Sequence, residues 1–147
     1  MTDEEVQATL LTLSGLYEAL VGTLENERAA LRAHSYEQLG QATDQKAALC
    51  AEIEARMTAL PCPLADLLSN AGADNRENLD LLHNKLCEVA REAKDFNAVN
   101  GKIISRSQQS VRELIGVING YEPNALYGAH GTALHGHSSG GPAIANA

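Results

Sequence analysis

The stretch VQATLLTLSGLYEALVGTLENERAAL, residues 6–31, decides the fold class of this 147-residue chain. Its large apolar residues recur at steps of 4, 3, 4, 3, 4 and 7, at Val6, Leu10, Leu13, Tyr17, Leu20, Leu24 and Leu31. Such steps place side chains on one face of an α-helix, and the resulting seven-residue repeat is typical of a coiled-coil seam. Thr2 and Glu5 have the spacing of a capping box, so the sequence predicts a helix over residues 3–33.

A second segment repeats this pattern between a serine and two prolines. Ser35 and Gln38 have capping-box spacing, and Pro61 and Pro63 stop a helix because proline lacks a backbone donor and clashes with the preceding turn. These limits predict a helix over residues 36–59. Its apolar stripe consists of Tyr36, Leu39, Leu49, Ile53, Met57 and Leu60.

The longest helical pattern follows a short helix predicted near residues 64–70. Asp74 and Glu77 give a third capping signal, and glycine and proline after residue 119 end the pattern, which predicts a helix over residues 75–119. Steps of three and four continue along Leu79, Leu82, Leu86, Val89, Ala93, Phe96, Ile103, Ser107, Val111, Leu114 and Ile118.

These segments predict an all-α fold. Long helices with short connections pack antiparallel, so we expect an elongated three-helix bundle or coiled coil over residues 1–120 with a long C-terminal helix. A flexible glycine-rich tail, whose only charged residue is Glu122, follows over residues 121–147.

The last predicted helix is longer than the two helices it would pack against. At about 1.5 Å per residue, its last third would extend beyond the bundle unless the helix bends near Gly101. That part carries an apolar face, which we expect another protein, the tail or a second copy to cover. The residues predicted to bind a partner are Ile103, Ile104, Val111, Leu114, Ile115 and Ile118.

Asn97, Asn100 and Gly101 interrupt the apolar seam of this helix, and both asparagine and glycine are unfavourable inside a helix. Two interpretations stay open. The asparagines form a polar layer that fixes the helix register, or the segment is a hinge or a place where another backbone comes close.

Composition and motifs exclude several classes of function. The net charge of −8, without a basic patch, disfavours binding to nucleic acid or to anionic membranes. No catalytic motif and no apolar stretch of roughly 18 residues occurs, so we expect neither an enzyme nor membrane insertion. The acidic N-terminus is unlike a signal peptide, which predicts a cytoplasmic protein.

Cysteine and histidine usage predicts no cofactor and no metal. Three cysteines without a CxxC pair are expected to be buried, reduced side chains. His130, His135 and His137 lie among glycines that cannot preorganise a metal site, so we interpret them as solvated.

Three stretches together resemble the FlgN-type flagellar export chaperones. LYEALVGTLENERAALRAHSYEQLGQATDQKAALCAEI is similar to the family's helical hairpin, with a glutamate near the end of the first helix and a lysine in the second. FNAVNGKII resembles an Asn-x-x-Asn-Gly signature in the last long helix. NALYGAHGTA resembles a Leu-Tyr-Gly-x-x-Gly element beyond that helix, with His130 where the family often has an acidic residue.

The resemblance implies a non-enzymatic cytoplasmic chaperone of flagellar type III export. Its clients would be hook-associated proteins 1 and 3, which form the hook–filament junction, bound through the C-terminal helical region. Leu126, Tyr127 and Gly128 match the element whose tyrosine is linked to docking at the export gate.

Two other hypotheses compete with this one. The chain could be a self-associating coiled coil, a homodimer whose last helix serves only dimerisation. A small enzyme or metal protein using the tail histidines is the third hypothesis, and the apolar faces of the helices favour the first two.

Overall fold

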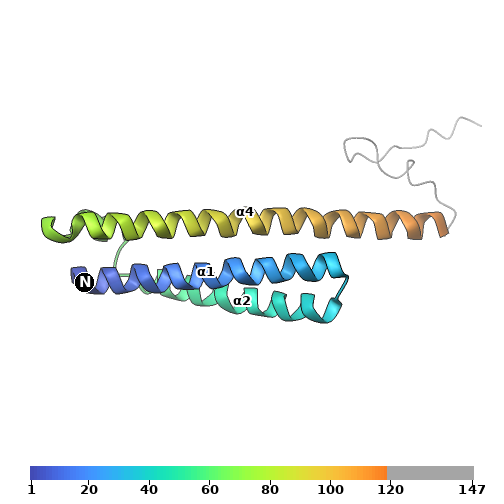
Figure 1. The fold of residues 1–147 in the computed structure, drawn as a ribbon, viewed down its shortest axis with the longest axis horizontal. Helices are drawn as coiled ribbons and strands as arrows, with labels where there is room; N and C mark the ends of the chain where they lie inside the picture. The colour runs from blue at the N-terminus through green and yellow to red at the C-terminus, as the bar shows by residue number, and fades with distance from the viewer. Residues whose placement is uncertain (119–147) are drawn as a thin grey trace, which may run out of the picture. The chain divides into compact units, whose positions relative to one another are not determined.

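The computed structural model describes residues 1–118, and every regular element in this range is helical. The elements are α1 (Asp3–Ala33), α2 (Tyr36–Thr58), α3 (Leu64–Ser69) and α4 (Ala73–Ile118), shown in Figure 1. The predicted all-α fold is confirmed, and each helix boundary lies within two residues of its prediction. Among the described residues, no helix is long and apolar enough to cross a membrane.

The first two helices begin as their capping patterns predict. The Thr2 hydroxyl accepts a hydrogen bond from the Glu5 backbone N–H at 3.2 Å, and the Glu5 carboxylate accepts one from the Thr2 backbone N–H at 2.6 Å. This second bond favours the charged carboxylate and lowers the pKa of Glu5 below its ordinary value. His34 ends α1 in the left-handed conformation (φ 52°), and the Ser35 hydroxyl caps α2.

The start of α4 differs from its prediction. The helix begins at Ala73, so Asp74 lies inside the first turn and is not the capping residue. The carboxylate of Asp3, from the first turn of α1, accepts hydrogen bonds from the Gly72 backbone N–H at 3.1 Å and from the Asn75 side chain at 2.9 Å. A carboxylate at a helix N-terminus is favourable because the backbone N–H groups there lack partners within the helix.

Two apolar clusters hold the helices together. In the first, α1 packs against α3 and α4 through Val6, Leu10, Leu13, Leu67, Leu68, Leu79 and Leu86. In the second, α1 packs against α2 and α4 through Leu20, Leu24, Ile53 and Ala93. Both clusters use the predicted stripes of α1 and α4, so the 3–4 spacing identified the core of these helices correctly.

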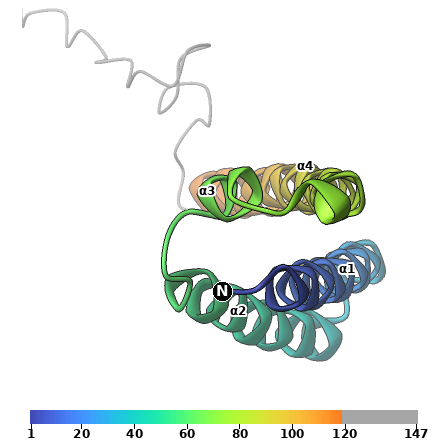
Figure 2. The same cartoon turned by 90° about the vertical axis from the view of Figure 1, so that its left-hand side faces the viewer.

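The helices of residues 1–104 follow an up-down-up order. Figure 1 shows α2 returning antiparallel to α1, and α4 running in the same direction as α1. The end-on view in Figure 2 shows α2 and α4 against different sides of α1. Helix α1 is therefore the element that both other long helices contact.

Parts of the predicted core are exposed. Tyr36 has 86% of its surface accessible and Met57 has 43%. Tyr36 is the first residue of α2, directly after the hairpin turn. Cys50 is also exposed, contrary to the expectation of buried cysteines, although all three cysteines are free.

Helix α4 is continuous through Gly101. Residues 1–104 form one compact unit, and the described residues 105–118 belong to a second. A Cβ atom added at Gly101 would meet nothing within 4 Å. Nothing in the described part of the chain therefore requires glycine at this position.

Candidate functional site

Asn100 lies at the centre of a buried polar cluster between α1 and α4. It is 1% exposed. Its side-chain nitrogen donates to the Leu24 carbonyl oxygen at 2.9 Å and to the Glu27 carboxylate at 2.8 Å. Its side-chain oxygen accepts from the Arg28 Nε at 3.0 Å. One amide is thus satisfied by three neighbouring residues of α1, as buried polar groups require.

The carboxylate of Glu27 joins all three long helices. Glu27 is 1% exposed, and its second oxygen accepts a hydrogen bond from the Lys46 ammonium of α2 at 2.6 Å. Burying a carboxylate is costly unless it is paired and hydrogen-bonded. Lys46 and Asn100 meet both conditions, so this glutamate requires α2 and α4 to be in place together.

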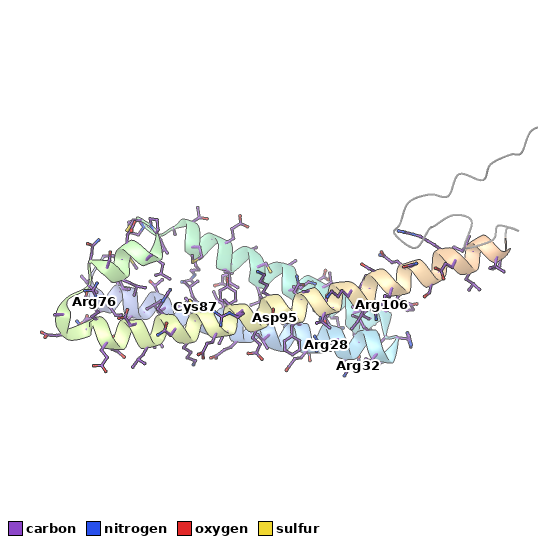
Figure 3. The ribbon with its side chains drawn as sticks, turned by 90° about the horizontal axis from the view of Figure 1, so that it is seen from above. Arg28, Arg32, Arg76, Cys87, Asp95 and Arg106 are labelled. Carbon is purple, nitrogen blue, oxygen red and sulfur yellow. The ribbon has the colours of Figure 1, made fainter. Side chains whose placement is uncertain are left out.

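Arg28 completes the cluster on its outer side. Its guanidinium lies 4.2 Å from the centre of the Phe96 ring, within the range of a cation–π contact. Figure 3 labels Arg28 on α1 where this helix runs beside α4. The contact places Arg28 so that it can also donate to Asn100. We call Glu27, Arg28, Lys46 and Asn100 the polar layer.

The polar layer explains one of the two asparagines. Asn100 occupies the seam position between Phe96 and Ile103, which makes it a buried register residue like those of coiled coils. Asn97 is exposed and lines a groove between α2 and α4. The structure therefore separates two residues that the sequence motif groups together.

The predicted partner-binding residues fall into two groups. Ile103 and Ile104 are half-buried at the end of the first compact unit. The others lie on the last turns of α4 and are exposed: Val111, Leu114, Ile115 and Ile118, together with Val117. Their accessible fractions run from 51% to 76%, which is unusual for five large aliphatic side chains within eight residues.

The predicted gate-docking residues Leu126, Tyr127 and Gly128 lie outside the described residues. The same holds for His130 and the other two histidines of the tail. Within residues 1–118, no group of three His, Cys, Asp or Glu side chains could hold a metal ion.

A family model described as FlgN protein matches residues 1–135. The chain belongs to the FlgN family. FlgN proteins are flagellar export chaperones, and the helical bundle described above fits that class. No curated protein and no solved structure matches this FlgN chain.

Sequence reasoning offered the asparagines as a polar layer that fixes the helix register, but it missed the other members of that layer in this FlgN structure, Glu27, Arg28 and Lys46. A signal was present, because the seam of α1 skips from Leu24 to Leu31 and the seam of α4 skips from Phe96 to Ile103. Glu27 and Asn100 occupy the skipped positions. Polar residues at seam positions of two helices could have been read as partners.

Proposed function

We propose that this FlgN protein is a cytoplasmic, non-enzymatic chaperone that binds hook-associated proteins 1 and 3 and delivers them to the flagellar type III export apparatus. Family membership supports the general class. The observation that carries the proposal is the exposed apolar face of Val111, Leu114, Ile115 and Ile118 at the end of α4. We call these four residues the terminal face.

The terminal face is suited to a client segment that orders on binding. Fully burying a Val, Leu or Ile side chain contributes about 1.5–3 kcal/mol. The four side chains of the terminal face are 51% to 76% exposed, so covering them together gives a useful affinity. A disordered client segment loses conformational entropy when it folds onto the helix, which keeps that affinity moderate. A chaperone that must release its client at the export apparatus needs this combination.

Docking at the export gate is assigned to Leu126, Tyr127 and Gly128. The resemblance of these residues to the Leu-Tyr-Gly element of the family supports this assignment. A tyrosine offers a large apolar ring with one polar tip, which suits an anchor at an interface.

The test introduces charge into the terminal face. We expect the double variant Leu114→Asp/Ile118→Asp to lose binding to hook-associated proteins 1 and 3, because an unpaired carboxylate is costly in an apolar interface. Isothermal titration calorimetry measures the affinity. The double variant Ser105→Asp/Ser110→Asp adds the same charge at exposed polar positions of α4 and should bind normally. Unchanged affinity of the first variant, with its helicity intact, would show that the binding face is wrongly assigned.

A self-associating coiled coil is the second candidate, because a second copy could also cover the terminal face. Sedimentation of the free protein separates the two candidates. A dimer that persists in the presence of client, and dissociates in the Leu114→Asp/Ile118→Asp variant, would favour self-association.

A further inference from the structure

A groove lies between α2 and α4, with α1 as its floor. Its volume is about 630 Å³. Its accessible lining is apolar and small, with Ala47 and Cys50 exposed and Tyr17 and Ala90 half-buried, while Leu20, Leu24 and Ala93 lie beneath as buried core residues. The groove exists because α2 and α4 pack on different sides of α1 (Figure 2). The small residues that α2 and α4 carry along the groove do not fill the space between these two helices.

The groove is about as long as a short helical segment. Its lining residues span positions 17–24 of α1, 43–50 of α2 and 90–97 of α4, which is about two turns of each helix. Small side chains on the walls allow another backbone to approach closely. An amphipathic helix could place two or three apolar side chains, spaced three or four residues apart, on this floor.

The charges of the groove specify its occupant further. Among the described residues that line it, Lys46 and Lys94 are basic and none is acidic, whereas the chain as a whole carries −8. Lys46 is bonded to Glu27 from below, and Lys94 is exposed. Because Glu27 neutralises Lys46, the exposed Lys94 is the charge that attracts an acidic segment to the groove, whereas the net charge of −8 opposes its approach elsewhere.

We propose that the groove is a second client-binding site, which holds an acidic amphipathic helix of the same client that the terminal face binds. The client helix rests its apolar side chains on Tyr17, Ala47 and Ala90 and places a carboxylate beside Lys94. This inference rests on the proposed function, since the client is the one named there. The terminal face and the groove lie on different parts of the chain, so each contact can be removed separately.

Two variants test the groove, each with a matched control. Ala47→Glu fills the groove and adds negative charge, while Ala51→Glu makes the same change one turn along α2, at an exposed residue outside the groove. Lys94→Glu reverses the exposed charge, and Lys102→Glu does so at an exposed position of α4 outside the groove. All four positions are on the surface of a helix, so the fold should be retained.

We expect Ala47→Glu and Lys94→Glu to weaken binding of full-length hook-associated protein about tenfold or more in calorimetry, and both controls to stay within about twofold of wild type. Equal affinities of each variant and its control would overturn the groove proposal and leave the proposed function standing. If wild-type protein binds neither client, the proposed function itself fails.

Cys50 gives a second, direct readout because its thiol is exposed and lines the groove. In a Cys62→Ser/Cys87→Ser background, we expect saturating client to slow alkylation of Cys50 by N-ethylmaleimide at least fivefold. The rate should recover when Lys94→Glu is added at the same client concentration. An alkylation rate that client leaves unchanged contradicts the proposal, as does protection that appears on self-association without client.

Discussion

Asn100 makes three hydrogen bonds to α1 with one small side chain, and the two that its nitrogen donates are fully buried. Leu24 contributes a backbone carbonyl, Glu27 a carboxylate and Arg28 a guanidinium nitrogen. Glu27 and Asn100 are both 1% exposed. A shift of α4 by one turn would separate all three pairs at once, so this residue determines the register between the two helices.

At the residue scale, we predict that Asn100→Ala lowers the free energy of unfolding by about 1–3 kcal/mol, because the buried carboxylate and carbonyl lose a donor. Urea denaturation followed by circular dichroism measures this loss. The exposed neighbour Asn97 is the control, and Asn97→Ala should change stability by less than about 0.5 kcal/mol. Similar losses for both asparagines would contradict the assignment of Asn100 alone to the polar layer.

Single side chains also show where prediction from sequence ends. The helix caps at Thr2 and Ser35 were predicted correctly because a cap depends on residues three apart. The pairing of Glu27 with Lys46 and Asn100 depends on the register between three helices. That register cannot be read from any single segment of the sequence. The exposure of Tyr36 was missed for the same reason, since burial is decided by what lies opposite.

At the scale of elements, α4 changes character along its length. Its first part is buried against α1 through Leu79, Leu86 and Ala93, and its last turns present large aliphatic side chains to solvent. The apolar spacing is the same in both parts, so periodicity predicted one helix correctly over its whole length. The exposed stripe was expected from the lengths of the helices, because α4 has 46 residues whereas α1 has 31 and α2 has 23.

Gly101 allows a test of whether α4 must bend. Since a Cβ atom there would meet nothing within 4 Å, we predict that Gly101→Ala raises the free energy of unfolding by up to about 1 kcal/mol. The same change at Gly22, inside α1 and equally open, should give a similar gain. Both are measured by chemical denaturation.

The alternative reading of Gly101 makes a different prediction. If a bend in α4 is needed, Gly101→Ala should destabilise the protein while Gly22→Ala stabilises it. If a partner's backbone approaches this position, the variant should be more stable and yet bind its client more weakly. Calorimetry on the same protein samples separates these results.

At the scale of the whole molecule, holding a client and docking at the export gate are assigned to different segments. We predict that Tyr127→Ala changes the free energy of unfolding by less than about 1 kcal/mol, leaves client affinity unchanged, and weakens binding to the purified export gate. Tyr36→Ala is the control, because Tyr36 is an exposed tyrosine at the hairpin tip. It should leave gate binding unchanged.

A large fall in melting temperature for Tyr127→Ala, with gate binding preserved, would show that the tyrosine is structural. Equal loss of gate binding in both tyrosine variants would show that the assay measures nonspecific binding through exposed tyrosines. Only selective loss in Tyr127→Ala supports separate client and gate segments.

The parallel pairing of α1 and α4 has a consequence for biosynthesis. Hydrogen-bonded partners in these helices stand 72 to 76 positions apart in the chain, from Asp3 with Asn75 to Leu24 with Asn100. At a translation rate of about 5–20 residues per second, each part of α1 waits about 4–15 s for its partner. The hairpin of α1 and α2 can close on the ribosome, but the stripe that α4 covers stays open for that time. The apolar stripe of α1 is therefore exposed during the first seconds after its synthesis. We expect slower translation of residues 34–100 to increase aggregation of the protein in the cell.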